Sequence, residues 1–370
     1  MKCEHFGVCG SCTLYEMDYQ TQLNFKLDRI KKLFKLKEVD VISSKPIHFR
    51  YRAEFRIYHD YEKKSISYAM FKKDKKGILP VKECFIVCES IAQIMQPLLD
   101  IIQEVEILYH RLFTIEFLAG DNDEVLVTLI YHKKIDAQWE DEAKKVAKKL
   151  KIDIIGRSRK IKKTVTKDFV IRNLNIFGRT YTFKLYESSF SQPNNLVNIK
   201  MIEWVKRGIK EVSGDLLELY CGHGNFTIAL ATNFRKILAT EVSKSSIKAA
   251  KENRSLNNIK NISFIRLSAQ ELMQAISKQR VFKRVDTDLD SYDISYVFVD
   301  PPRAGIDDLT LKFIQNYENI IYISCNPITL KRDLEVLKKR FKIEKFAIFD
   351  QFAYTHHIEC GVFLKKTDFQ

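Results

Sequence analysis

The chain has 370 residues but no long uninterrupted apolar run. Its most apolar long stretch, residues 91–109, carries Asp100, Glu104 and Glu106, which predicts an amphipathic helix and excludes a membrane span. The first residues form no apolar signal region, so we expect a cytoplasmic protein with no membrane partner. With 12 glycines, 7 prolines, no internal repeat and no low-complexity tract, the chain is neither a repeat protein nor a flexible linker.

Negative charge is also in short supply. The chain has 62 Lys and Arg residues against 47 Asp and Glu residues, which gives a formal charge of +15. Such an excess indicates a polyanionic partner, with nucleic acid as the first candidate and a merely soluble basic surface as the alternative. Hydrophobic residues make up 45% of the chain, so we expect a globular protein of two or three domains.

The pattern of apolar runs divides the chain into regions. From about residue 214 onward, short β-rich runs alternate with helical patterns, which predicts an α/β domain over residues 214–370. Its sheet should be mostly parallel with helices on both faces, and its last two strands should form an antiparallel hairpin on one edge. Residues 49–167 mix strands and helices without this alternation and are expected to form an α+β region. Residues 1–48 hold a cysteine motif and a basic helix, and residues 168–213 connect the two larger regions.

Positive charge is concentrated in the first half of the chain. Residues 144–167 contain eleven Lys and Arg residues and a single acid, Asp153. We therefore expect the α+β region to hold a nucleic-acid backbone. Aromatic residues are interleaved with these charges and are candidates for stacking on unpaired bases, although for any single one of them a place in the strand core is favoured. They are Tyr51, Phe55, Tyr58, Phe113 and Tyr131.

A glycine-containing turn follows the first apolar run of the α/β region. The run at residues 216–220 leads into Gly222 and Gly224, and this G-x-G spacing does not meet the dinucleotide-binding fingerprint. About twenty residues further on, Glu241 ends the next predicted strand, where a carboxylate can accept hydrogen bonds from ribose hydroxyls. The combination favours the adenosine part of S-adenosylmethionine, with a purely structural βα turn as the alternative.

Three reactive side chains follow the ends of later apolar runs. Asp300 precedes Pro301 and Pro302, which stiffen the strand exit, Cys325 follows another strand, and Glu359 lies close to the end of the chain. In a parallel α/β sheet, residues just past the carboxyl ends of strands meet at the ligand crevice. The sequence therefore predicts that a carboxylate, a thiol and a second carboxylate converge on one pocket.

This set fits a particular reaction on a pyrimidine. The Cys325 thiolate would attack C6, C5 would then take a methyl group from the sulfonium donor, and Glu359 would remove the C5 proton so that the thiol can leave. The dipole of the helix after Cys325 is expected to lower the pKa of its thiol, and an inert core cysteine is the alternative. The Gln192 carboxamide suits the O4/N3 edge of uracil, or else serves as a turn residue.

Taken together, these residues resemble the RNA uracil-5-methyltransferase family over about residues 49–364, with its tRNA enzymes as the most similar branch. The matching segments are YRAEFRI (51–57), YHKK (131–134), FSQPN (190–194), GDLLELYCG (214–222), FVDPPR (298–303), YISCNP (322–327), FDQF (349–352) and YTHHIECGV (354–362). The resemblance implies a Rossmann-like class I S-adenosylmethionine-dependent methyltransferase domain with an N-terminal α+β RNA-binding region. It also implies methylation of uridine at C5 in the tRNA T-loop, with the T-arm as partner of a monomeric enzyme.

Site roles follow from the same resemblance. Cys325 matches the nucleophile and Glu359 the base, and Phe113 matches a residue that fills the space left by a flipped uridine. Five residues match positions that bind S-adenosylmethionine, and two of them, Gln192 and Asp300, are also placed to touch the target uracil. The five are Gln192, Tyr220, Asn225, Glu241 and Asp300.

The N-terminal cysteines form a second motif. Cys3, Cys9 and Cys12 have the spacing C-x5-C-x2-C, and Cys84 and Cys88 follow about seventy residues later. Thiolates at this spacing suit a [4Fe–4S] cluster better than zinc, and a degenerate remnant that binds nothing is the alternative. The pattern is similar to the ribosomal-RNA members of the family, in which Cys84 matches the fourth ligand better than Cys88.

Three other functions remain open at this point. The cysteine motif favours ribosomal RNA as the substrate, whereas the rest of the chain favours tRNA. An RNA-folding factor with secondary methyl transfer is another hypothesis. Cytosine-5 methylation is disfavoured because the second catalytic cysteine that it usually requires, in a Pro-Cys context, does not occur in the sequence.

Overall fold

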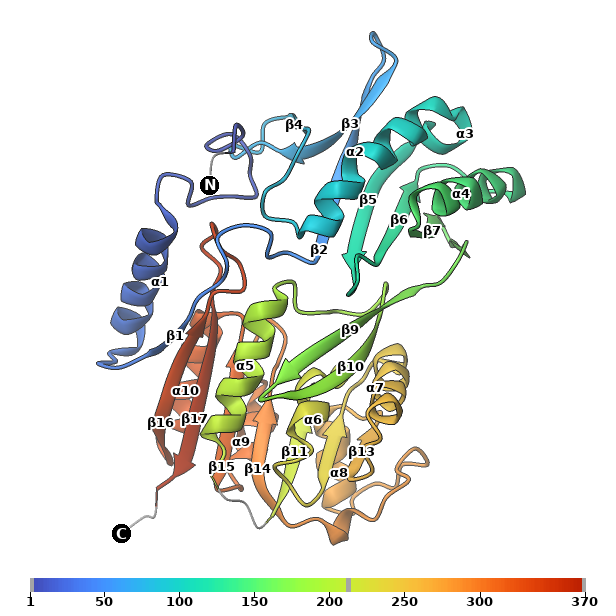
Figure 1. The fold of residues 1–370 in the computed structure, drawn as a ribbon. Helices are drawn as coiled ribbons and strands as arrows, with labels where there is room; N and C mark the ends of the chain where they lie inside the picture. Colours follow the sequence, from blue (N-terminus) through green and yellow to red (C-terminus); the bar gives the residue numbers. More distant parts are fainter. Residues whose placement is uncertain (1–2, 211–213, 368–370) are drawn as a thin grey trace.

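The computed structural model describes residues 3–210 and 214–367 (Figure 1). An N-terminal part built on a seven-stranded sheet lies beside a C-terminal part built on an eight-stranded sheet. Ahead of both come helix α1 (Tyr19–Phe34) and the short strand β1 (Asp40–Ile42). Within the described ranges no helix is both long enough and apolar enough to cross a bilayer.

The seven-stranded sheet has the order β4-β3-β2-β5-β6-β7-β8. Its strands are β2 (Arg52–Asp60), β3 (Ser65–Phe71), β4 (Ile78–Val81), β5 (Leu112–Ala119), β6 (Val125–Tyr131), β7 (Asp153–Ser158) and β8 (Ile161–Thr164). Three helices supply the rest of its core: α2 (Glu89–Glu104), α3 (Glu106–Tyr109) and α4 (Ala137–Leu150). The buried positions of β2 alternate along the strand, as expected for a sheet with one face covered.

Two of the aromatic residues proposed for base stacking belong to this core. Phe55 and Tyr131 are 3% and 2% exposed, and the Tyr131 hydroxyl donates to the carbonyl of Leu108. For these two residues the expected strand-core role is confirmed, because their strand positions face the helices. Tyr58 remains 40% exposed, and the ring of Phe113 stacks on His132 with centroids 4.0 Å apart.

A hairpin and a helix connect the two parts. They are β9 (Phe169–Ile176), β10 (Arg179–Tyr186) and α5 (Asn195–Gly208). The eight-stranded sheet follows, in the order β1-β16-β17-β15-β14-β11-β12-β13. Its later strands are β11 (Asp215–Leu219), β12 (Ile237–Thr240), β13 (Ile262–Ile265), β14 (Ile294–Val299), β15 (Asn319–Ser324), β16 (Phe341–Phe349) and β17 (Glu359–Lys366).

Helices cover both faces of the eight-stranded sheet, which confirms the predicted α/β class. One face packs against α5, α6 (Asn225–Leu230), α7 (Lys244–Leu256) and the β9–β10 hairpin. The other face packs against α1, α8 (Ala269–Ile276), α9 (Asp308–Ile314) and α10 (Pro327–Leu337). A short 3-10 helix (Leu289–Ser291) precedes β14.

The last hairpin does not lie at the edge of the sheet. β16 and β17 pair antiparallel as predicted, but β17 also pairs antiparallel with β15, and β1 pairs parallel with β16. The expected edge position is therefore wrong, because three residues from the N-terminal segment form the outer strand. The carboxyl ends of the parallel strands, with β14 as the clearest example in Figure 1, point toward the N-terminal part.

Candidate active site

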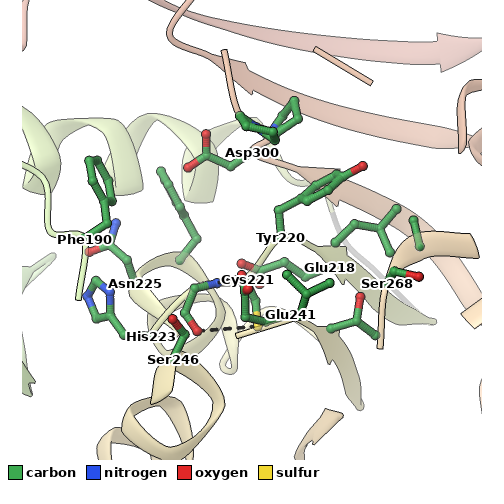
Figure 2. Close-up of a pocket in the computed structure, with 18 of the residues that line it drawn as sticks. Phe190, Glu218, Tyr220, Cys221, His223, Asn225, Glu241, Ser246, Ser268 and Asp300 are labelled. Carbon is green, nitrogen blue, oxygen red and sulfur yellow. Dashed lines mark hydrogen bonds between the residues drawn. The ribbon is translucent and has the colours of Figure 1, made fainter. Parts of the chain in front are cut away.

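A cavity of about 740 Å³ opens at the carboxyl edge of the eight-stranded sheet. Its lining comes from the turns after β11, β12, β14 and β15, from the start of β17 and from the loop that carries Phe190 and Gln192. Figure 2 shows part of this lining, with Phe190 and Ser268 on opposite sides of the space and Asp300 at its upper end. All seven residues predicted for catalysis and cofactor binding line this one cavity: Gln192, Tyr220, Asn225, Glu241, Asp300, Cys325 and Glu359.

The turn after β11 leaves room for a ligand. Tyr220 and Gly222 both have left-handed backbone conformations, with φ of +62° and +54°. A Cβ added at Gly222 would meet no atom within 4 Å, so the backbone there borders open space. Helix α6 begins at Asn225, whose carboxamide exchanges two hydrogen bonds of 2.9 and 2.8 Å with that of Asn198.

Glu241 closes the turn from the neighbouring strand. One carboxylate oxygen accepts from the backbone N–H of Gly222 at 3.2 Å, and the other accepts from that of Ser243 at 2.8 Å. These bonds fix the acid at the end of β12, beside the glycine turn. Each carboxylate oxygen retains a lone pair for a further donor, which is the arrangement that ribose hydroxyls require.

Strand pairing brings the reactive groups together. Val299 pairs with Tyr322, so Asp300 follows β14 next to the end of β15. Ser324 pairs with Cys360 across the antiparallel β15–β17 ladder. Cys325 and Glu359 come directly beyond this last pair, both line the cavity, and the charge of Glu359 acts on the Cys325 thiol.

Burial changes the protonation of the two carboxyl groups. Burial raises the pKa of Asp300 to about 7. Burial, together with the charge of Asp300, raises the pKa of Glu359 to about 8. Near neutral pH a large share of both groups is therefore protonated.

The thiol of Cys325 departs from its prediction. Its pKa is raised, first by burial and then by the charges of Glu359 and Asp300, against a lowering contribution from Arg303. The sequence predicted a lowered pKa from the following helix, and this was wrong because desolvation and two nearby acids outweigh the helix N-terminus. Protonation of the acids removes that repulsion, so the carboxyl groups and the thiolate are electrostatically linked.

Glu218 is a site residue that the sequence analysis missed. It is buried in β11 and lines the cavity, and burial together with the charge of Asp300 raises its pKa to about 8. An acid inside the apolar run Leu216–Leu219 was the available signal, because a buried carboxyl in a strand core is costly unless it meets a partner or a ligand.

Several buried polar atoms of the cavity lack hydrogen-bond partners among the described residues. They are Oε1 of Gln192, Oε2 of Glu218 and Oε2 of Glu359. Unpartnered buried acceptors and hydroxyls are costly in a free protein. The cavity therefore presents several unpartnered polar atoms, which suits a ligand with several hydrogen-bond donors.

The N-terminal cysteines meet at a second cavity of about 330 Å³. Cys3, Cys9, Cys12 and Cys84 all line it, whereas Cys88 does not. Burial and the charges of the other three cysteines raise the pKa of Cys12 to about 12. Across residues 3–210 and 214–367, no group of three or more His, Cys, Asp or Glu side chains is placed to hold a metal ion.

The donor set of the larger cavity fits S-adenosylmethionine. The glycine turn gives open space beside the backbone, Glu241 is placed for a ribose, and the orphaned acceptor of Glu218 lies deeper in the same cavity. A parallel sheet with helices on both faces and this site at its carboxyl edge define a class I S-adenosylmethionine-dependent methyltransferase.

Comparison with known proteins narrows the class to a family. The sequence model of the family tRNA (Uracil-5-)-methyltransferase matches residues 18–367, and the chain belongs to this family. A tRNA/tmRNA (uracil-C(5))-methyltransferase of Nitratiruptor sp. is 50% identical over 99% of this chain and 100% of its own length. The enzyme of the same description from Aliarcobacter butzleri is 50% identical over 99% of each chain.

A solved structure shares the fold. The tRNA (uracil-54, C5)-methyltransferase of Pyrococcus abyssi, solved with S-adenosyl-L-homocysteine, has a TM-score of 0.74. The match covers 97% of this chain and 86% of that chain at 22% identity, which is a likeness of fold. It confirms the predicted Rossmann-like fold.

The raised pKa of Glu359 leads to a prediction about stability. A carboxyl whose pKa rises on folding, from 4.5 to about 8, contributes stability at low pH that is lost as pH rises through this interval. Glu359→Gln removes that loss, so the variant should melt about 3 °C or more above wild type at pH 8.5 and close to wild type at pH 5. Thermal denaturation across this pH range measures the difference. A variant that melts below wild type at high pH would contradict a protonated, buried Glu359.

Proposed function

We propose that this protein methylates C5 of a uridine in the T-loop of tRNA. The observation that carries the proposal is that Cys325 and Glu359, just beyond the last β15–β17 pair, both line the cavity that fits S-adenosylmethionine. A thiol and a base on the same side of one pocket suit addition to a pyrimidine and later removal of a proton. The name of the Pyrococcus abyssi enzyme specifies uracil-54, and the names of the curated relatives add tmRNA as a second substrate.

In the proposed reaction, the Cys325 thiolate adds to C6 of the uracil and the electron pair moves to C5. S-adenosylmethionine supplies the methyl group that C5 takes up. Glu359 in its carboxylate form then removes the C5 proton, the C6–S bond breaks and the thiolate is restored. Protonated Asp300 spares the thiolate the repulsion of a second anion beside the Glu359 carboxylate.

Gln192 and Asp300 are proposed to hold the uracil. The unpartnered Oε1 of Gln192 can accept from the N3–H of uracil, and its NH₂ group can donate to a carbonyl. Protonated Asp300 can donate a hydrogen bond in the same cavity. Tyr220, Asn225 and Glu241 are proposed to hold the cofactor, on the grounds of their common position around the turn after β11.

Phe113 is proposed to occupy the space that the flipped uridine leaves. Its ring already stacks on His132, and the guanidinium of Arg56 lies 4.9 Å from the ring centroid. Once the uridine has left the base stack, the flat Phe113–His132 pair can stack on the neighbouring base in its place. The Arg56 cation beside the pair lies where the phosphate backbone would pass.

Methyl transfer to RNA tests the proposed substrate directly. Purified protein with labelled S-adenosylmethionine should methylate unmodified tRNA, and mapping should place the product in the T-loop. Ribosomal RNA transcripts and a tRNA whose T-loop uridine is replaced by cytidine serve as controls. Transfer to ribosomal RNA alone would move the substrate to the other branch of the family, and transfer to neither would refute the proposal.

A trapped adduct tests the chemistry. tRNA that contains 5-fluorouracil should form a complex stable to denaturation, because C5 then carries no removable proton. Cys325→Ala should abolish the complex, whereas the matched change Cys221→Ala, at a buried cysteine beside the same cavity, should leave the thiol attack intact. A shifted band that persists in Cys325→Ala would exclude this residue as the nucleophile.

We propose in addition that Cys3, Cys9, Cys12 and Cys84 hold a [4Fe–4S] cluster. Their common cavity supports this set, and because the described thiols are not placed to hold a metal ion, binding of the cluster requires them to move together and ionise. Thiolate ligation by four cysteines satisfies the coordination of such a cluster, and no step of the methyl transfer is assigned to it.

Metal analysis checks the cluster. Protein purified without oxygen should contain about four iron atoms and four sulfides per chain and absorb visible light. Cys84→Ser should lose this signal, and Cys88→Ser should keep it, since Cys88 donates to or accepts from Ser90 instead. One zinc ion per chain, or no metal in fresh anaerobic protein, would contradict the cluster.

A further inference from the structure

Helix α1 holds the loop that leads into Glu359. This loop, residues 350–358, joins β16 to β17, and the pair Phe349 and Glu359 closes the ladder at its end. Glu359 therefore lies at the junction between a paired strand and an unpaired loop. Strand pairing fixes the backbone that follows Glu359, and the conformation of the loop determines the backbone that precedes it.

One face of α1 contacts the loop along its length. The Lys26 ammonium donates to Oδ1 of Asp350 at 2.6 Å and to the carbonyl of Phe352 at 3.0 Å. Further along the loop, Oε1 of Gln22 accepts from the backbone N–H of Tyr354 at 2.5 Å. Arg29 donates to the carbonyl of His356 at 3.3 Å.

The ion pair at the centre of this contact is buried. The side chains of Lys26 and Asp350 are 2% and 1% exposed. The Tyr19 hydroxyl donates to the other oxygen of Asp350 at 3.0 Å and accepts from the backbone N–H of Ser44 at 2.6 Å. Tyr19, Gln22, Lys26 and Arg29 recur at helical spacing, so they form one face of α1.

The same loop also holds the segment that follows Gln192. Oε1 of Gln351 accepts from the backbone N–H of Asn194, and the Asn194 carboxamide donates to Ser44. The segments that carry Gln192 and Glu359 both contribute side chains to the cavity, and both are held by the loop that contacts α1. A buried ion pair adds little net stability compared with an apolar pair of similar size, but it favours one geometry over others.

We propose that α1 is a positioning element for the proton-removal step, with Lys26 and Asp350 fixing the loop so that Glu359 faces the C5 proton. The inference rests on the proposed function and extends it to residues far from the cavity. Lys26 touches neither cofactor nor RNA in this account and acts through the loop. Its loss should therefore slow proton removal more than the binding or addition steps.

The test compares variants of the full-length protein. Lys26→Met should lower kcat on tRNA about tenfold or more, because small displacements of a reacting group have large effects on rate. The KM for S-adenosylmethionine and the rate of adduct formation with 5-fluorouracil tRNA should stay within about twofold of wild type. With ordinary tRNA, a covalent complex should accumulate during turnover. Lys32→Met, at an exposed lysine of the same helix, is the matched control and should behave as wild type.

A double variant separates positioning from simple stabilisation. Lys26→Met with Asp350→Leu leaves no buried charge unpaired, so its melting temperature should recover while kcat stays low. Recovery of kcat together with stability would overturn the proposal, as would a normal kcat in Lys26→Met. Tyr19→Phe removes one hydroxyl at the pair and should lower kcat about threefold with the same accumulated complex. If Lys26→Met does not fold, wild-type kinetics in Tyr19→Phe would decide against the proposal.

The outcome for wild type keeps the two proposals apart. If wild-type protein forms no adduct with 5-fluorouracil tRNA and transfers no methyl group, the proposed function fails regardless of Lys26. If wild type forms the adduct and the Lys26 variant releases product at the same rate, only the positioning role fails.

Discussion

Antiparallel pairing of β17 with β15 is the constraint on which the cavity depends. The other neighbours of β15 and β14 are parallel, so their carboxyl ends meet at one edge and offer only residues that follow strands. Because β17 runs in the opposite direction, the residue at its start lies at the same edge as the residues that follow the parallel strands. In this way Glu359, at the start of β17, lines the same cavity as Cys325, which follows β15.

Three carboxyl groups line the cavity, and burial shields all three from water. Glu218, Asp300 and Glu359 are all held with raised pKa values, and each is raised first by burial. A site of three ionised carboxylates would repel a thiolate and strain the fold. Partial protonation removes that difficulty, and it also means that the arrival of a ligand can change which group holds a proton. Glu218 and Glu359 each keep a buried oxygen without a partner, which lowers stability but leaves that oxygen available to a ligand or a reacting group.

Much of this arrangement could be predicted from the sequence. Strand ends are marked by short apolar runs followed by turn residues, and parallel strands place such ends together, so the meeting of Asp300 and Cys325 followed from order alone, whereas that of Glu359 also needed the antiparallel direction of β17. The raised pKa of Cys325 could not, because desolvation depends on the packed surroundings. The pairing of β1 was also hidden, since three residues carry no periodic signal and their partner lies about three hundred positions away in sequence.

The sequence showed how many charges the basic stretch carries, but not which of its lysines pair with acids. Lysines of the basic stretch pair with acids that lie outside it, such as Lys167 with Glu124 and Lys163 with Glu140. Counting charges within one window could not reveal these partners. Likewise Lys26 sat in a helix with a basic face, and nothing local distinguished it from its exposed neighbours before Asp350 was placed beside it.

The outer strand of the catalytic sheet has a consequence for biosynthesis. Asp40–Ile42 pair with residues 347–349, so two ends of the polypeptide must meet before the sheet is complete. The seven-stranded sheet, by contrast, draws all its strands from residues 52–164 and can assemble while the ribosome is still translating. β1 therefore has no strand partner until residues 347–349 have been synthesised.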